Sequence, residues 1–505
     1  MSPDSPDECA KRTEEQMTDD ERFSLLISMI GPLPLIGLAR DARIPDGVDN
    51  LSAGYTPGVP RLGVPALQSS DASMGVANPG FRPHDPGATA FPCTLLVGAT
   101  FNPDLARAQG AAIGREARSR GFNVLLAGGV NLARDPRNGR NFEYYGEDPL
   151  LAGVMAAEAV RGTQSEGVIS TLKHFTLNCN ETNRHWLDAV IEPAAHRESD
   201  LLAFQIAVER AEPGAIMSAY NKVNGVYASG HHHLLNEVLK GSWGFAGYVM
   251  SDWGAAPEWE YALAGLDQES GVQIDVMLWG SEGFTHKLRA AYAEGKLPKA
   301  RLSEMVRRML RSIYAVGADR WGPAPEVDLA KHRETALETA RQGIVLLKNE
   351  GVLPLATDRA LKIAVIGGFA QEGVATGTGS AAVQPIGGYA GVVKIGGTGM
   401  MGGSRNLYLL PPSPLAELKR LLPQAQVEFD AGYTPAEAVL LARRSDVAIV
   451  FGVRAEGEGY DSADLSLPWG QDAVIDAVAS ENPNTIVVLE TGNPVSMPWR
   501  GKVKA

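Results

Sequence analysis

The stretch Phe245–Gly254 reads FAGYVMSDWG, an apolar run that ends abruptly at an acid. Its centre, Tyr248–Met250, has the composition of a buried strand, and Asp252 stands where that strand would end. The same pattern of a short apolar run followed by polar residues recurs along the first three hundred residues. The other runs are Val64–Leu67, Phe122–Leu126, Val168–Leu172 and Ala215–Ala219.

Segments with helical spacing of apolar residues lie between these runs, namely Leu105–Ser119, Leu150–Ser165 and His196–Glu212. Strands that alternate with helices predict βαβ units and a mostly parallel sheet. Three hundred residues of this pattern favour a (β/α)8 TIM-like barrel over an open sheet, although periodicity alone does not decide closure. The predicted fold class is therefore α/β, a barrel followed by a second α/β domain.

The domain boundaries follow from composition. Residues 1–19 are polar and acidic and are predicted to be a flexible N-terminus, and residues 20–316 form the barrel. A Gly- and Pro-bearing stretch opens a linker over residues 317–343, which leads into the second domain over residues 344–505. The strands expected there are few, so we expect this domain to be incomplete at its C-terminal end. They are Ile344–Leu347, Lys362–Ile366, Val447–Phe451 and Thr485–Leu489.

Composition excludes several classes of function. The 505 residues carry a net charge of −13, and an acidic surface repels nucleic-acid phosphates and anionic lipids, so neither partner is expected. Cys9, Cys93 and Cys179 are odd in number and far apart, which indicates neither a disulfide framework nor a zinc site. The N-terminus lacks the features of a signal peptide. As written, the sequence predicts a cytoplasmic protein, or a periplasmic or secreted one if a leader lies upstream. Its oligomeric state stays open.

Polar side chains capable of binding a ligand follow each apolar run. In a barrel the carboxyl ends of the strands meet on one face, where active sites form. Carboxylates accept hydrogen bonds from sugar hydroxyls while Lys and Arg donate to them, so the cluster suits a polyhydroxylated ligand. Its members are Asp71, Arg134, Arg137, Arg140, Glu143, Asp148, Lys173, His174, Asn180, Glu181, Asn183, Arg184, Tyr220, Asn221, Asp252 and Trp253.

Each of these residues also fits a purely structural role. Asp252 could cap a helix or form a turn, and Lys173 with His174 could end a solvated loop. Arg140 could form an ion pair with a nearby glutamate, and Tyr220 could be a packed aromatic. Their joint occurrence at successive strand ends favours the functional interpretation.

Retaining hydrolysis of a glycosidic bond requires two carboxyl groups about 5–5.5 Å apart, one a nucleophile and the other an acid/base. Asp252 at a strand end, beside the flat ring of Trp253, is the candidate nucleophile. The second carboxyl group remains open from the residues alone. The candidates are Glu143, Glu147 and Glu181 among the arginines, and Glu456 and Glu458 in the glycine-flanked loop RAEGEGYD.

Several strings together resemble glycoside hydrolase family 3, especially its bacterial β-glucosidases. They are KHF followed by NETNR, MSAYNKVNG, GRNFEYYGEDP and GYVMSDW, with VLLKNEGVLPL at Val345–Leu355 resembling the segment that joins the family's two catalytic domains. GEGYD resembles its acid/base loop. The resemblance runs from about residue 20 to the end.

The resemblance implies a barrel plus an α/β sandwich with the site between them. It implies a retaining exo-β-glycosidase that hydrolyses terminal non-reducing β-D-glucosyl residues of a small glucoside or oligosaccharide, without metal or organic cofactor. Asp252 would be the nucleophile and Glu458 the acid/base. The residues that would bind the sugar are Asp71, Arg140, Lys173, His174, Arg184 and Tyr220, with Trp253 as a wall and Ser380 as a further contact.

The sequence also departs from the family pattern. Ala72 follows Asp71 where the family usually has Gly, and the loop TLNCNETNRHW lacks the His-Asp pair of the family's β-N-acetylglucosaminidases. Family members usually continue past residue 505. Two alternatives therefore stay open: a β-xylosidase or arabinosidase of the same family, and a truncated carbohydrate-binding fragment with little activity. The aglycone and linkage preferences are not predicted.

Overall fold

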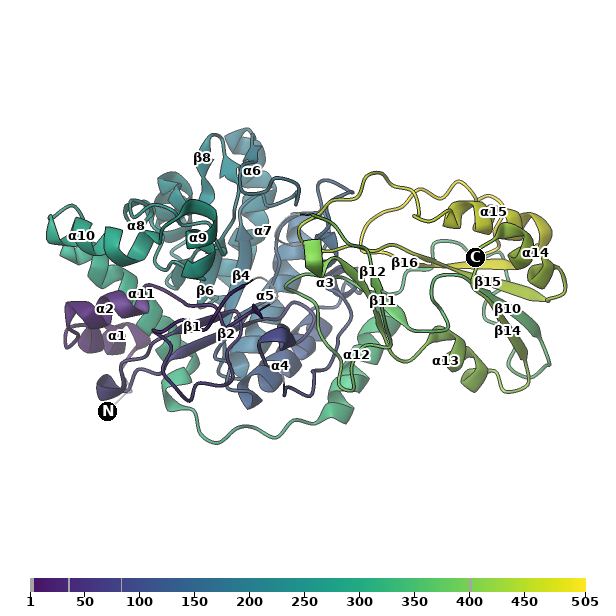
Figure 1. The fold of residues 1–505 in the computed structure, drawn as a ribbon, viewed down its shortest axis with the longest axis horizontal. Helices are drawn as coiled ribbons and strands as arrows, with labels where there is room; N and C mark the ends of the chain where they lie inside the picture. The colour runs from purple at the N-terminus through teal and green to yellow at the C-terminus, as the bar shows by residue number, and fades with distance from the viewer. Residues whose placement is uncertain (1–3, 35–36, 83, 399–401) are drawn as a thin grey trace. The chain divides into compact units, whose positions relative to one another are not determined.

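The structure, a computed structural model, describes residues 4–34, 37–82, 84–398 and 402–505. The chain divides into two compact units (Figure 1). Unit 1 comprises residues 1–134, 143–179 and 183–343, and unit 2 comprises residues 135–142, 180–182 and 344–505. Two short segments of unit 2 therefore interrupt the sequence of unit 1, each directly after the region of a strand.

The main sheet of unit 1 has the order β1-β2-β3-β4-β6-β9. β1 runs antiparallel to β2, and the remaining neighbours are parallel, so the carboxyl ends of five strands share one edge. β9 coincides with the predicted run, and the runs Phe122–Leu126, Val168–Leu172 and Ala215–Ala219 are confirmed as strands with shifted ends, whereas the run Val64–Leu67 shares only Leu67 with the observed strand. The strands are β1 (Gly54–Thr56), β2 (Leu67–Asp71), β3 (Val124–Leu126), β4 (Ile169–Phe175), β6 (Ala215–Ser218) and β9 (Tyr248–Met250).

The eight regular strand–helix repeats of the predicted barrel are not all present among the described residues. β1 is antiparallel, and beyond β9 the pairing continues only through isolated bridges. These bridges join Met250 to Gln268, Glu269 to Ile27, and Met29 to Tyr55 of β1. The coarser prediction of an α/β fold in two units is confirmed.

Helices flank the strands of unit 1, and the starts of α1, α2, α4 and α5 carry side-chain caps. Asp148 accepts a hydrogen bond from the Leu151 N–H at 2.7 Å and precedes Pro149, a combination that favours a helix start. The helices are α1 (Pro6–Glu14), α2 (Asp19–Leu25), α3 (Thr94–Ala99), α4 (Pro103–Ser119), α5 (Pro149–Ser165), α6 (Pro193–Glu198), α7 (Asp200–Ala211), α8 (Tyr261–Ala264), α9 (Val272–Trp279), α10 (Leu288–Ala293), α11 (Lys299–Val316) and α12 (Leu329–Gly343). A small second sheet contains β5 (Asp188–Ala189), β7 (Lys222–Val223) and β8 (Val226–Tyr227).

Two segments of unit 1 are more ordered than their composition indicates. The segment predicted to be a flexible N-terminus contains α1, which packs against α11, and the buried Glu14 binds Arg22 at 2.7 Å and Ser303 at 2.8 Å. The predicted linker contains α12, which packs against α3 and α4 (Figure 1). These contacts depend on a buried ion pair and on one packed face of each helix. Composition does not reveal them, because it does not show which polar residues are buried.

Unit 2 is built on a parallel sheet of order β14-β10-β15-β16. Alternate residues of β10 enter two separate apolar clusters, so both faces of the sheet are covered. A three-stranded antiparallel sheet, β11-β13-β12, accompanies it. The elements are β10 (Lys362–Ile366), β11 (Val374–Thr376), β12 (Gly391–Lys394), β13 (Asn406–Leu410), α13 (Pro414–Leu421), β14 (Gln426–Asp430), α14 (Pro435–Arg443), β15 (Val447–Val453), α15 (Gln471–Glu481) and β16 (Thr485–Glu490).

One predicted strand of unit 2 is wrong. Ile344–Leu347 has no regular secondary structure, and its four side chains are 59–72% exposed. A run of β-branched and apolar residues forms a strand only where a neighbouring strand completes its hydrogen bonds, and the described residues provide none here. The predicted strands at Lys362–Ile366, Val447–Phe451 and Thr485–Leu489 are confirmed as β10, β15 and β16.

Candidate functional site

Asp252 lies two residues beyond the end of β9 and is 5% exposed. Its Oδ1 accepts a hydrogen bond from the Trp253 N–H at 2.9 Å, and the Trp253 ring N–H donates to the Ala53 carbonyl at 2.9 Å. The next helix that the structure describes, α8, begins only at Tyr261. Asp252 is therefore not a helix cap, and its carboxylate stands at the carboxyl edge of the sheet beside a fixed indole.

His174 lies close to this acid. Its Nε2 lies 3.8 Å from Asp252 Oδ2, and both side chains are buried. Asn131 holds the histidine in place, because its Oδ1 accepts the His174 backbone N–H at 2.7 Å and its amide donates to the His174 carbonyl at 2.8 Å. The sequence analysis did not single out Asn131, which stands in the loop after β3.

Lys173 and Asp71 form a buried ion pair, with Nζ 3.2 Å from Oδ1. The amide of Asn78 donates to the other oxygen of Asp71 at 3.0 Å. Lys173 and His174 lie within β4, which extends to Phe175, rather than after it as the apolar run predicted. A buried ion pair is costly to desolvate and is weak evidence for stability, which favours a ligand-binding role for the pair.

Arg184 and Tyr220 stack on each other at the same edge of unit 1. The guanidinium carbon lies 4.3 Å from the centre of the tyrosine ring, and the His185 ring lies 4.4 Å from it on a tilted plane. All three side chains are buried. Six of the residues predicted from the sequence are thus buried in unit 1 and lie in three contacting pairs: Asp71 with Lys173, His174 with Asp252, and Arg184 with Tyr220, with Trp253 next to Asp252 in the chain.

In unit 2 the carboxyl group of Glu458 contacts Ser380 and Arg140. The backbone N–H of Ser380 donates to its Oε2 at 2.8 Å, and Arg140 Nη1 lies 3.5 Å from its Oε1. Ser380 thus contacts the glutamate through its backbone, a contact that a side-chain motif does not reveal. A Cβ at Gly379 would lie 2.3 Å from the Cβ of Glu458, so this approach requires glycine.

Glu456, two residues earlier, is also buried. The N–H of Gly492 donates to its Oε2 at 2.6 Å, and Arg454 Nε lies 3.7 Å from its other oxygen. Burial outweighs the attraction of Arg454 and raises the pKa of Glu456 to about 7. The loop therefore contains two buried glutamates, of which Glu458 is the one held by Arg140.

The other candidate carboxylates have different environments. Glu143 is fully buried and accepts a hydrogen bond from Ser73 Oγ at 3.3 Å, whereas Glu147 is exposed. Glu181 belongs to unit 2, where its Oε2 accepts the Gly459 N–H at 2.8 Å. Glu181 thus binds the backbone of the loop that carries Glu458.

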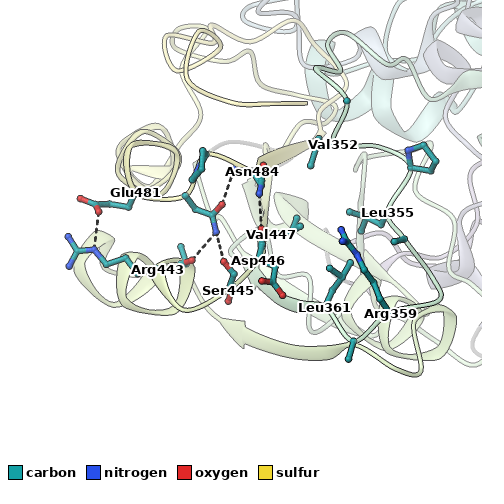
Figure 2. A pocket seen from close by; sticks show the side chains of 17 residues that line it. Val352, Leu355, Arg359, Leu361, Arg443, Ser445, Asp446, Val447, Glu481 and Asn484 are labelled. Atoms are coloured by element: carbon teal, nitrogen blue, oxygen red, sulfur yellow. Dashed lines mark hydrogen bonds and ion pairs between the residues drawn. The ribbon is translucent and has the colours of Figure 1, made fainter.

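Figure 2 shows a cavity of about 760 Å³ in unit 2, beside the amino ends of β10, β15 and β16. Its polar wall is occupied by internal contacts: Arg443 pairs with Glu481 at 2.9 Å, and Asp446 accepts the Lys362 N–H at 2.7 Å. The described residues that line it include none of those predicted for the site. The cavity lies at the opposite strand ends from the loop of Glu458.

No helix of the described residues combines the length and the apolar character that a membrane crossing needs. The described residues also contain no group of three or more His, Cys, Asp and Glu side chains that could hold a metal ion.

Comparison with known proteins identifies the family. Residues 48–312 match the glycosyl hydrolase family 3 N-terminal domain, and residues 344–505 match the family's C-terminal domain. The chain is 36% identical over 475 residues to a beta-glucosidase of Bacteroides ovatus, BoGH3A, covering 88% of this chain and 62% of that protein. It is 32% identical over 490 residues to an exo-alpha-(1->6)-L-arabinopyranosidase of Bifidobacterium breve, covering 92% of this chain and 61% of that protein.

Similarity to a solved structure agrees with these family matches. Beta-glucosidase 3B from Thermotoga neapolitana, in complex with glucose, superimposes with a TM-score of 0.83 at 32% identity over 98% of this chain and 71% of that one. The chain spans less than two thirds of the length of the two relatives from Bacteroides and Bifidobacterium. Both domain matches and the overall similarity lead to one conclusion: the chain belongs to glycoside hydrolase family 3.

Proposed function

We propose that the protein is a retaining exo-β-glycosidase that releases terminal non-reducing β-D-glucosyl residues from small glucosides or oligosaccharides. The observation that carries the proposal is the buried cluster at the strand ends of unit 1, where Asp252 lies 3.8 Å from His174 and Lys173 pairs with Asp71. Family membership and the relatives named as beta-glucosidases support it.

In the proposed first step a carboxylate oxygen of Asp252 attacks the anomeric carbon. The bond to the leaving oxygen breaks, and that oxygen takes a proton from the carboxyl group of Glu458. In the second step Glu458 removes a proton from water, the water oxygen attacks the anomeric carbon, and the bond to Asp252 breaks. The reaction uses two carboxyl groups and water, and it requires them to be about 5–5.5 Å apart around the bound sugar.

The remaining residues have roles that follow from their chemistry. Asp71 would accept hydrogen bonds from sugar hydroxyls, while Lys173, His174 and Arg184 would donate to them. These side chains are buried and held by partners, so binding a sugar costs little further ordering of the side chains. Tyr220 and Trp253 would contact the faces of the sugar ring. Arg140 and Ser380 would add polar contacts to the sugar.

We also infer that the main sheet of unit 1 closes into a barrel. The bridges Met250–Gln268, Glu269–Ile27 and Met29–Tyr55 support a path from β9 back to β1 through two short segments. Backbone hydrogen bonds accompany each bridge, such as Ser251 N–H to the Gln268 carbonyl at 2.9 Å and Ser28 N–H to the Glu269 carbonyl at 2.9 Å. In a closed sheet the strand ends form one rim, which would gather the proposed sugar-binding residues.

The proposal is tested by trapping the intermediate. A 2-deoxy-2-fluoro β-glucoside with a good leaving group should inactivate the protein, because fluorine slows both steps while the good leaving group keeps attachment of the sugar to Asp252 faster than its release. Digestion and mass spectrometry should locate the added sugar on the peptide that contains Asp252. A sugar attached to another carboxylate, or hydrolysis of an aryl β-glucoside without any covalent adduct, would refute the assignment.

A second candidate is activity on pentosides, and the similarity to the Bifidobacterium exo-alpha-(1->6)-L-arabinopyranosidase favours it. A pentopyranose lacks the hydroxymethyl group of glucose, yet its ring hydroxyls could meet the same Asp71 and Lys173. Comparing kcat/KM on aryl β-D-glucoside, aryl β-D-xyloside and aryl α-L-arabinopyranoside separates the candidates. A higher value on either pentoside would replace glucoside as the proposed substrate.

A further inference from the structure

Two short segments from distant parts of the sequence contact the loop that carries Glu458. Residues 135–142 follow β3 and residues 180–182 follow β4, and both belong to unit 2 rather than to the unit that contains those strands. The N–H of Ser462 donates to the Arg137 carbonyl at 2.8 Å. Each segment is therefore preceded and followed in the sequence by residues of unit 1.

Asp461 accepts hydrogen bonds from both segments. Its Oδ1 accepts the Gly139 N–H at 3.1 Å and the Glu181 N–H at 3.0 Å, and its Oδ2 accepts the Thr182 N–H at 2.8 Å. One carboxylate thus binds the backbone of both segments. Hydrogen bonds to an ionised acceptor are roughly twice as strong as neutral ones, which makes this contact a firm one.

Glu181 in turn binds the backbone of the loop that carries Glu458. Glu181, whose own N–H binds Asp461, accepts the N–H of Gly459 at 2.8 Å on its Oε2. Gly459 is the residue directly after Glu458. A Cβ at Gly139 would lie 1.9 Å from the Tyr460 carbonyl oxygen, so the segment lies against the loop backbone without room for a side chain. The loop is therefore fixed at positions one, two and three residues beyond Glu458.

We propose that Asp461 and Glu181 are positioning residues that hold the Glu458 carboxyl group at the place where it transfers its proton. The proposal rests on the proposed function above. Glycines 457 and 459 flank Glu458, and Gly459 has a φ of +90°, so the bare loop would sample many conformations. Asp461 and Glu181 remove that freedom, and they dock beside Glu458 the segment that contributes Arg140.

The expected signature is a selective loss of proton transfer. A misplacement of about 1 Å costs roughly 10²-fold in rate when a catalytic group must reach a reacting atom. A leaving group such as 2,4-dinitrophenolate departs without protonation, whereas phenolate benefits strongly from it. Loss of the positioning contacts should therefore slow the phenyl glucoside and leave the dinitrophenyl glucoside nearly unchanged.

The test compares Asp461→Asn with the wild-type protein on phenyl and 2,4-dinitrophenyl β-D-glucoside. We expect kcat/KM to fall about 10²-fold on the phenyl substrate and less than about threefold on the dinitrophenyl substrate. Inhibition by glucose should change less than kcat/KM on the phenyl substrate, because the sugar-binding residues of unit 1 are intact. Glu181→Gln should give the same pattern, and the double variant should lose little more than either single variant.

Asp464→Asn is the matched control, because among the described residues this carboxylate in the same loop accepts a hydrogen bond only from the Ser466 N–H, at 2.8 Å. Its substitution should change neither substrate's kcat/KM. Equal losses on both substrates in Asp461→Asn and Glu181→Gln, or no loss in either, would overturn the positioning role while leaving the proposed function intact. If the wild-type protein hydrolyses neither glucoside, the proposed function fails, and the positioning role fails with it. If Asp461→Asn does not fold, Glu181→Gln decides the question alone.

Discussion

The two proposed catalytic carboxyl groups are held in different ways. Asp252 stands at the end of a short strand, and its neighbours His174 and Asp71 stand on or at the ends of parallel strands of the same sheet. Glu458 stands in a glycine-flanked loop, and its position depends on Asp461 and on Glu181, which is 280 residues from Asp461. The nucleophile side is fixed by sheet geometry, and the acid/base side by a few polar contacts across long sequence separations.

This difference predicts which substitutions should abolish activity and which should only reduce it. A group at the end of a buried strand moves only if the sheet moves, because close packing transmits little local freedom. A group on a loop held by individual hydrogen bonds can be displaced by one substitution. We therefore expect changes on the nucleophile side to remove chemistry outright, and changes around the acid/base loop to be graded and dependent on the leaving group.

The largest effect is expected for Asp252→Ala, which removes the proposed nucleophile. Loss of a covalent nucleophile costs about 10⁴-fold or more in kcat. Added azide should restore part of the turnover and yield the α-anomer of glucosyl azide, because the anion attacks from the face that the carboxylate vacated. The exposed Asp104→Ala is the control. Residual activity above a few per cent, or a β-azide product, would place the nucleophile elsewhere.

Glu458→Ala should be less severe and depend on the substrate. General acid–base catalysis is worth about 10²–10⁴-fold, so phenyl β-glucoside should lose that much while 2,4-dinitrophenyl β-glucoside forms the glycosyl-enzyme at a near-normal rate. Azide should here give the β-anomer, because it attacks an intermediate that has already been inverted once. The product is identified by NMR. An α-azide product, or equal loss on both substrates, would contradict the acid/base role.

The same contrast explains what the sequence could predict. Tyr248–Met250 and Lys362–Ile366 are strands with the predicted bounds, because alternation of apolar runs and helices is a local signal. Strand-end residues such as Asp252 follow from that alone. Asp461 was quoted only as part of a motif, since its partners are backbone N–H groups that carry no sequence signature. The roles of these residues in catalysis remain predictions.

A smaller effect is expected for Gly139→Ala, which tests the loop contact without removing any polar group. The new Cβ would lie 1.9 Å from the Tyr460 carbonyl oxygen and 2.3 Å from that of Gly457, so the backbone must shift. Overpacking of this kind costs about 1–3 kcal/mol, and we expect a partial loss of kcat/KM on phenyl β-glucoside. Gly501→Ala, where a Cβ would meet no atom within 4 Å, is the control. A variant as stable and active as the control would show that the contact is dispensable.

A further effect is one of stability against pH, and it concerns Glu456. Burial raises its pKa from the ordinary value of 4.5 to about 7. Between pH 4.5 and 7 the unfolded chain has released this proton while the folded chain still holds it. The free energy of unfolding must therefore fall as pH rises through this window, by on the order of 3 kcal/mol, and stay level above it.

Glu456→Gln removes this titration and leaves a side-chain oxygen that can accept the Gly492 N–H. Denaturant unfolding at pH 5 and pH 8 should show a smaller loss of stability in the variant than in the wild-type protein. A residual slope is expected because burial also raises the pKa of Glu490 to about 7. The exposed Glu437→Gln should keep the wild-type slope. If Glu456→Gln also keeps it, the buried glutamate is not protonated in the folded loop.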